Sequence, residues 1–248
     1  MAFKLGKQPA THDPRDLTYD TYRDPKTTVT VPSTFGHYGL VQTWGMLGND
    51  KYGDCVWAGG DHETIMWNAE AGRTVAFGDQ DALADYAACT GFDPKKRSTD
   101  KGTNVRAALS YRRKTGLRDA GGTRHKIGAY VALEPGNYDH VLEAIYLFGA
   151  VGIGLQFPSS AMAQFDKGKP WSVVGGASIE GGHYVPLVGV AHGRLDCVTW
   201  GKVQPMTKTF FAKYCDEAWA LVSVEALAAG KSPEGFDLQQ LTDDLAAL

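Results

Sequence analysis

The sequence predicts an α+β fold in two lobes, because helical patterns fill its first part and strand patterns fill its last part. Amphipathic stretches stopped by glycine recur up to about residue 149, and short apolar or β-branched runs bounded by turns follow. Helices followed by strands favour segregated layers over alternating β-α units. The 248 residues fit one core, divided into two lobes around a cleft.

Charge and hydropathy exclude two broad classes of partner. The net charge is −3, which does not favour binding through a nucleic-acid backbone. The longest apolar run, residues 144–155, is too short and too glycine-rich to cross a bilayer. The N-terminal stretch lacks the apolar core of a secretory signal. We therefore expect no nucleic-acid partner and no membrane span.

The chain divides into three parts by composition. Residues 1–34 are polar and threonine-rich and predict an extended arm without its own core. Residues 35–225 hold the periodic patterns of the main domain, and residues 226–248 predict a helical tail. Leucines in the tail, spaced three, four and three apart, form a narrow apolar seam: Leu238, Leu241, Leu245 and Leu248. Docking on its own domain is the favoured interpretation. The alternative is that the arm and residues 236–248 bind an assembly partner or a second copy.

The first predicted helix begins at Cys55 and ends near Gly72. Asp54 stands at the position of an N-cap, directly after the glycine-rich loop that Gly53 ends. Two glycines inside this helix, residues 59–60, each destabilise it by about 1 kcal/mol relative to alanine. We expect another element to pack too closely there for a side chain.

The other predicted elements follow from periodicity and stop signals. Three further helices are expected, over residues 79–89, 103–116 and 137–149. Four strands are expected after them, over residues 150–157, 183–191, 195–201 and 217–224.

Cys55 is the strongest candidate for a nucleophile. The partial positive charge at a helix N-terminus favours the thiolate form of a cysteine. Attack on a carbonyl also needs a histidine as proton acceptor and donors for the oxyanion. His62 lies two turns further along the same helix, about 10 Å away, and is too far. His183 follows a glycine-rich loop and opens an apolar strand, so it is the better candidate.

From about Pro32 to Val224 the sequence resembles the papain-like (C1) cysteine peptidases. Asn49 stands six residues before Cys55, where that family has glutamine, and "GGHYVPLVGV" corresponds to the family's Gly-His strand. The spacing of 183 − 55 = 128 residues is close to the family's. The segment "HDPRDLTYD" in the arm resembles bacterial and phage members.

The resemblance implies a helical lobe followed by an antiparallel strand lobe, with a cleft that binds a peptide or protein substrate. It implies a Cys55–His183 thiolate mechanism, with Asn49 and the Cys55 backbone N–H as oxyanion donors. Gly102 and Thr103 match a substrate-lining turn, and Trp57 stands one residue beyond the aromatic that follows the family's cysteine. These matches make the three residues the candidate substrate-binding residues. No metal or cofactor is expected.

The sequence departs from this family at the residue that orients the histidine. The family has an asparagine where this chain has Val198, which cannot accept a hydrogen bond from the imidazole. Asp196 lies on the same strand face and is our candidate for the role. Thr199 should point to the other face unless the strand bulges. A water, or no group at all, are the remaining alternatives.

The family's disulfides are expected to be absent, because Tyr52 stands where the partner of Cys89 would be. Cys89, Cys197 and Cys215 are therefore expected to be free and packed. A zinc site built on residues 61–63 is disfavoured, because consecutive helical residues diverge around the axis.

Two functions stay open at this point. The first is a cysteine peptidase or amidase. The second is a weak or inactive papain-fold binding or structural protein, such as a component of a phage virion. The expected location is cytoplasmic or inside a phage particle.

Overall fold

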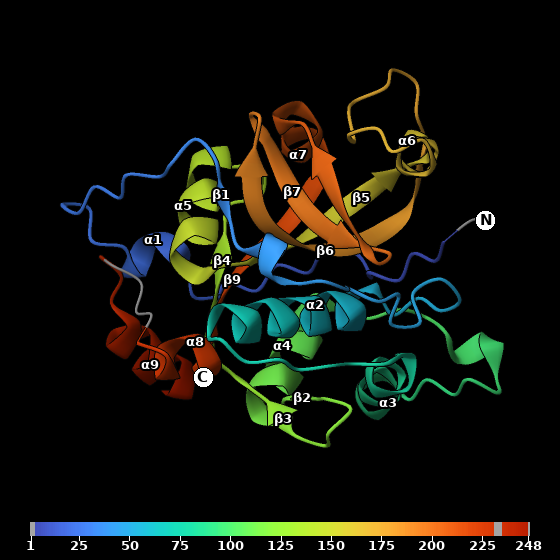
Figure 1. The fold of residues 1–248 in the computed structure, drawn as a ribbon, viewed down its shortest axis with the longest axis horizontal. Helices are drawn as coiled ribbons and strands as arrows, with labels where there is room; N and C mark the ends of the chain where they lie inside the picture. Colours follow the sequence, from blue (N-terminus) through green and yellow to red (C-terminus); the bar gives the residue numbers. More distant parts are fainter. Residues whose placement is uncertain (1–2, 231–234, 248) are drawn as a thin grey trace.

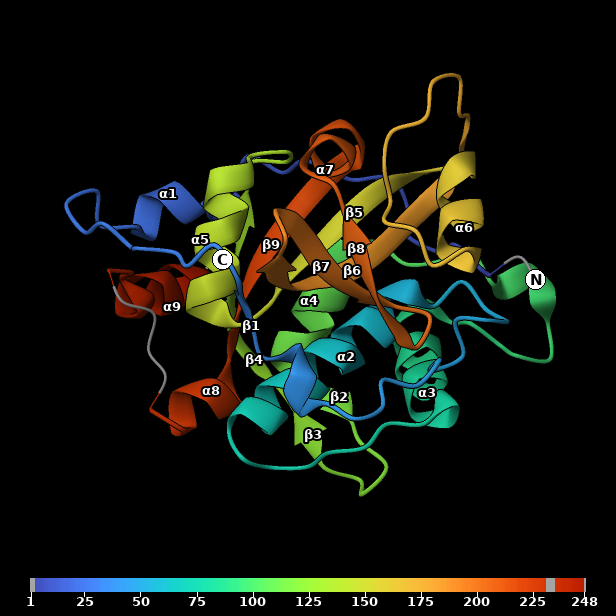
Figure 2. The ribbon, with the colours of Figure 1, turned by 45° about the horizontal axis from the view of Figure 1, so that its top comes forward.

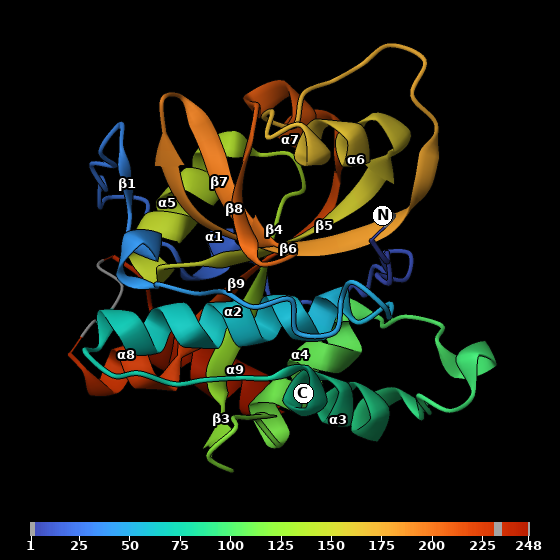
Figure 3. The same cartoon turned by 45° about the vertical axis from the view of Figure 1, so that its right-hand side comes forward.

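The computed structural model describes residues 3–230 and 235–247. It contains a twisted antiparallel sheet that lies above a layer of helices, and the long helix α2 (Cys55–Glu70) runs along the boundary between them (Figures 1 and 3). The strands follow the order β4-β9-β5-β6-β7-β8, and the short β1 pairs with β6. The predicted α+β fold with a helical and a strand lobe is confirmed.

The remaining elements are bounded as follows. The other helices are α1 (Tyr19–Tyr22), α3 (Asp79–Thr90), α4 (Val105–Lys114), α5 (Tyr138–Phe148), α6 (Ser159–Asp166), α7 (Lys208–Tyr214), α8 (Val224–Ala228) and α9 (Leu238–Ala247), with 3-10 turns η1 (Tyr38–Leu40) and η2 (Arg97–Thr99). The strands are β1 (Phe35–Gly36), β2 (Leu117–Arg118), β3 (Arg124–His125), β4 (Ile127–Leu133), β5 (Val151–Pro158), β6 (Ile179–Ala191), β7 (Arg194–Thr199), β8 (Lys202–Met206) and β9 (Cys215–Ser223).

Helix α2 packs directly on β6, and this contact explains its two glycines. A Cβ on Gly59 would lie 2.6 Å from the ring of Tyr184 in β6. A Cβ on Gly60 would lie 3.0 Å from Leu117 on the other side of the helix. The predicted close approach is confirmed, and it brings the N-terminal half of α2 against the strand that carries His183.

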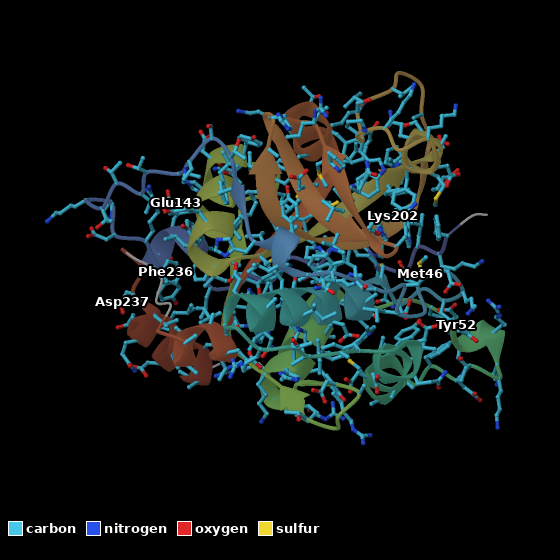
Figure 4. The ribbon with its side chains drawn as sticks, viewed as in Figure 1. Met46, Tyr52, Glu143, Lys202, Phe236 and Asp237 are labelled. Atoms are coloured by element: carbon cyan, nitrogen blue, oxygen red, sulfur yellow. The ribbon has the colours of Figure 1, made fainter. Side chains whose placement is uncertain are left out.

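The N-terminal arm and the C-terminal tail both pack on the main domain through the residues that the structure describes. Tyr19 and Tyr22 of α1 are buried, and both rings contact Phe236 just before α9. Leu241 and Leu245 of α9 are also buried in this core, while Leu248 lies outside the described residues. Figure 4 shows Phe236 and Asp237 at one end of the molecule, near Glu143 of α5. The tail seam therefore docks on its own domain.

Strand β4 was not predicted, and it interrupts the expected order of helices then strands. It lies between α4 and α5, and its side chains alternate between buried and half-buried positions. That alternation is a strand signal that the flanking helical patterns obscured. Helices α6 and α7 and strand β8 were also missed. Within the described ranges no helix has the length and apolarity to cross a bilayer.

Candidate active site

Cys55 is the first residue of α2, and its thiol is sealed from solvent. The residue is 2% exposed. Burial raises the pKa of the thiol to about 12, against smaller lowering effects of the backbone of Tyr184 and of Gly6. The thiol thus faces the residue that follows His183 on β6. In this state it is a neutral thiol at neutral pH, which is a poor nucleophile.

Asp54 occupies the N-cap position, as expected, but its side chain caps no backbone N–H. Its carboxylate is fully buried and accepts a hydrogen bond from Asn49 Nδ2 at 3.2 Å. Burial raises the pKa of this carboxyl well above its usual value, so the group is held mainly neutral. A neutral Asp54 opposes thiolate formation at Cys55 less than a charged one would.

Asn49, the expected oxyanion donor, is buried in the loop before α2. Its side-chain amide lies 3.1 Å from the carbonyl oxygen of Tyr52 and 3.3 Å from that of Lys4, besides its contact with Asp54. A carbonyl oxygen of the N-terminal arm therefore lies against the amide that was expected to hold an oxyanion.

His183 is fully buried in β6 and is held on two sides. Its Nε2 lies 2.8 Å from Thr199 Oγ1. Its ring stacks on Trp200, with centroids 4.5 Å apart and planes 17° apart. Burial lowers the pKa of His183 to about 3, which keeps the ring neutral. Among the described residues, Nδ1 is buried without a hydrogen-bond partner.

The expectation that Asp196 contacts His183 is wrong. Asp196 Oδ2 accepts a hydrogen bond from the hydroxyl of Tyr38 at 2.8 Å, whereas Thr199 makes the contact to the imidazole. Strand β7 pairs with β8 in regular register, so Asp196 and Thr199 lie on opposite faces. The side chains of β7 do alternate between two faces, as expected. The imidazole, however, lies on the Thr199 face and not on the Asp196 face.

Trp200 reaches the His183 ring because of an unusual backbone conformation. Trp200 and Gly201 form the two-residue turn between β7 and β8, with φ values of 45° and 73°. Positive φ at both central residues is the geometry of tight hairpin turns, and it is uncommon for a bulky side chain.

Residues 3–9 of the arm, here called the cleft segment, lie across these groups. The amides of Gly6 and Lys7 both donate to the carbonyl oxygen of Gly182, at 3.2 and 3.0 Å. On the other side, Thr103 N–H donates to the carbonyl of Gly6 at 2.7 Å, and Gln8 N–H donates to that of Thr103 at 2.9 Å. The segment is thus hydrogen-bonded to both lobes.

The candidate substrate-binding residues meet this segment in different ways. A Cβ on Gly102 would lie 2.0 Å from the carbonyl oxygen of Gly6, so the two backbones touch. Thr103 binds the segment through its backbone, as described above. Trp57 is 1% exposed and lies behind Thr103, with its indole N–H donating to Thr103 Oγ1 at 2.9 Å. Trp57 therefore supports the wall and does not contact the segment through that hydrogen bond.

A groove of about 740 Å³ borders the cleft segment and is lined by both lobes, including Gly53, Gly102, Gln156 and Gly182. Figure 2 shows the segment beginning near α6, at the end of the molecule where α2 starts. All four cysteines are free, as expected, with Cys89 and Cys215 half-buried. Within residues 3–230 and 235–247, no group of three or more His, Cys, Asp or Glu side chains could hold a metal ion.

Two contributors were missed by sequence reasoning, and a third, Thr199, was named only as an alternative to Asp196. Trp200 was passed over although the pair "WG" is a turn signal beside a candidate strand. The cleft segment offered no local signal, because its contacts depend on the tertiary fold.

Several solved structures with a similar fold are described as cysteine proteases. Xylellain, a cysteine protease from Xylella fastidiosa, matches with a TM-score of 0.69 at 13% identity, over 90% of this chain and 98% of that one. Procathepsin B S9 from Trypanosoma congolense matches with a TM-score of 0.63 at 12% identity, over 89% and 86%. The protease and lectin-like domains of Cwp84 from Clostridium difficile match with a TM-score of 0.60 at 14% identity, over 89% and 56%.

No family model and no curated protein matches the chain. The matches to solved structures confirm the resemblance to papain-like cysteine peptidases at the level of the fold.

Proposed function

We propose that the chain is a papain-like cysteine peptidase or amidase, present here in a latent form with the cleft segment over its site. The observation that carries the proposal is the support of His183. Thr199 binds one ring nitrogen and Trp200 stacks on the ring, which fixes the imidazole where β6 passes the thiol of Cys55. Orientation of a histidine by a hydrogen bond on its far nitrogen is the arrangement that cysteine and serine hydrolases require.

The chemistry follows from the protonation of this ring. With the Nε2 proton donated to Thr199 Oγ1, Nδ1 is the nitrogen with a free lone pair. It takes the proton of the Cys55 thiol, and the thiolate attacks the carbonyl carbon of a peptide or protein substrate. The imidazolium then gives its proton to the leaving amine, and water releases the acyl group from sulfur.

The oxyanion formed in this attack needs donors near the start of α2. The backbone N–H of Cys55 belongs to the first turn of the helix, where N–H groups lack partners within the helix. Asn49 supplies a second donor once the carbonyl oxygen of Lys4 leaves its side-chain amide. Departure of the cleft segment therefore opens the groove and frees a donor together.

The segment also contributes to the burial that keeps the thiol neutral, since Gly6 lies against it. Burial is the largest cause of the shifted pKa at both Cys55 and His183. Since Gly6 lies against the thiol, removing the segment admits water and reduces that burial. We expect the thiol pKa to fall with this burial, which favours the thiolate.

The test uses a variant that displaces the segment without changing its charge. A Cβ on Gly6 would lie 1.8 Å from the backbone oxygen of Gly53, so Gly6→Val cannot keep the observed path. We expect alkylation of Cys55 by iodoacetamide at pH 7, followed by mass spectrometry, to be at least ~100-fold faster in Gly6→Val than in the unchanged chain. This rate should vary little with pH near neutrality and be lost with His183→Ala.

Gly39→Val is the matched control, since no atom beyond its two chain neighbours lies within 4 Å of a Cβ placed there. Lys7→Glu, which brings a negative charge to Asp216, is a second way to displace the segment.

The second candidate is a papain-fold binding or structural protein, for example in a phage particle. The observation that favours it is the sealed thiol beside the buried Asp54 carboxyl. Alkylation in both displaced variants at the rate of an ordinary thiol, unchanged by His183→Ala, would support this candidate and reject the peptidase.

A further inference from the structure

The Lys7 side chain is buried in an acidic pocket beside the candidate site. Its side chain is 1% exposed, and its ammonium lies 2.9 Å from Asp216 Oδ2 and 3.0 Å from Glu217 Oε1. The ammonium also donates to the carbonyl oxygen of Gln8 at 3.1 Å. Lysine is almost never this buried unless its charge is paired, so the pocket is fitted to a cation.

The walls of the pocket leave room for a long side chain. A Cβ on Gly154 would lie 2.0 Å from Lys7 Cε and 2.6 Å from Glu217 Cγ. Glycine at this position of β5 is therefore necessary for the lysine stem to pass. A Cβ on Gly182 would lie 2.2 Å from the carbonyl oxygen of Lys7, so a second glycine gives space for the backbone.

The two carboxylates are held by the domain as well as by Lys7. Trp219 Nε1 donates to Glu217 Oε2 at 3.0 Å, which fixes this carboxylate from within β9. Burial raises the pKa of Glu217, and the charge of Lys7 opposes that shift. Without a cation, two adjacent carboxylates would remain poorly hydrated, which is unfavourable. Departure of Lys7 would remove the positive charge that these two carboxylates contact here.

The pocket lies next to the groups that would carry the reaction. Lys7 follows Gly6, whose backbone faces the Cys55 thiol, and both amides bind the carbonyl that precedes His183. A substrate that replaces the segment along Thr103 and Gly182 would bring one of its side chains to the same place.

We propose that this pocket, built on Asp216, Glu217 and Gly154, selects a peptide substrate with a lysine or arginine side chain. The proposal rests on the peptidase function proposed above and names its substrate class. Within it, Lys7 occupies the pocket as the substrate's basic side chain would. The competing explanation is that the ion pairs serve only to fasten the cleft segment.

The experiment uses the full chain carrying Gly6→Val and Lys7→Gln, which displaces the segment and removes its lysine. Fluorogenic tetrapeptide coumarylamides are compared in pairs that differ by lysine or norleucine at one position. Norleucine keeps the apolar stem of lysine without the ammonium. We expect kcat/KM at one position to be ~10- to 100-fold higher for lysine, in line with the strength of charge-assisted hydrogen bonds.

The preference should fall to within about twofold when Asp216→Asn and Glu217→Gln are added. Asp139→Asn, an exposed carboxylate at the start of α5, is the control for loss of charge and should keep the preference. A lysine preference that survives the double replacement, or a preference for norleucine, overturns the proposal.

A binding measurement separates this proposal from the chemistry. A synthetic peptide of residues 3–9 is titrated into the displaced chain carrying Cys55→Ala, with lysine or norleucine at its fifth position. We expect at least ~10-fold weaker binding with norleucine. Equal binding of the two peptides contradicts the pocket assignment. Absence of turnover together with slow Cys55 alkylation rejects the peptidase, whereas turnover without a lysine preference rejects only the specificity.

Discussion

The cleft segment and the C-terminal tail both pack on the domain, but through different chemistry. The cleft segment is held mainly by backbone hydrogen bonds and by the ion pairs of Lys7, and its Phe3 ring stacks on an aromatic side chain, that of Trp200. The tail is held by apolar burial, with Leu241 at 0% and Leu245 at 5% exposure and Phe236 among aromatic rings. A substrate can replace the polar contacts of the cleft segment with its own hydrogen bonds. The buried leucines of the tail would lose their apolar contacts on exposure to water, and water offers nothing equivalent. We therefore expect the cleft segment to be displaceable and the tail to stay bound to the domain.

The largest expected effect in this comparison is the loss of stability caused by a cavity in the tail. Leu241→Ala should destabilise the chain by about 2–5 kcal/mol, because a fully buried leucine leaves a cavity. In a chain of this size the melting temperature should fall by roughly 5–15 °C in calorimetry. Gln239→Ala, on the exposed face of α9, is the control and should change it little.

The same pair of variants tests whether the tail is a handle for a second copy. With an internal role, the mass in solution measured by light scattering is the same for Leu241→Ala and the unchanged chain. A change of mass at constant melting temperature would show that the seam serves assembly. Gly6→Val should lower the melting temperature less than Leu241→Ala, because its segment can leave and rehydrate.

A smaller effect is expected at the orienting residue. In the Gly6→Val background, Thr199→Val should slow alkylation of Cys55 by about tenfold, since the imidazole loses the group that fixes its Nε2. Asp196→Asn should change the rate less than twofold, because its carboxylate binds Tyr38. The opposite ranking would show that Asp196 turns to the ring when the segment leaves.

The sequence predicted the parts of this site that local patterns encode. Cys55 could be placed because a glycine-rich turn and a helix start meet there, and His183 because a glycine-rich loop precedes an apolar strand. Their roles as nucleophile and base stay predictions. Thr199 was ranked behind Asp196 because period-2 alternation gives two faces and does not say which one meets the imidazole.

Lys7 lay beyond prediction for a different reason. Its partners, Asp216 and Glu217, are more than 200 residues away in the chain, and only the fold brings them together. Nothing in the letters around Lys7 distinguishes it from a solvated lysine of an extended arm. Contacts between distant segments of ordinary polar composition are the part of a site that single-sequence patterns leave out.

The smallest effect concerns the charged contact at the start of the tail. His125 in β3 lies 2.8 Å from Glu225 Oε1 in α8 and 3.1 Å from Asp119 Oδ2. The hydrogen bond to Glu225 is the main cause that raises the pKa of His125, with a smaller contribution from Asp119. A raised folded-state pKa stabilises the chain fully below the unfolded value near 6.5, and this contribution is lost as pH rises through the folded value.

The melting temperature of the unchanged chain should therefore fall between pH 6 and pH 9. Part of this fall should be absent in the His125→Gln variant. The expected size is about 1 kcal/mol, or roughly 2–4 °C. His12→Gln, an exposed histidine of the arm, should keep the full pH dependence. If His125→Gln keeps it as well, the pH-sensitive contact lies elsewhere. The tail would then be held by apolar burial and by hydrogen bonds such as that of the Tyr22 hydroxyl to Asp244, without a contribution that depends on His125.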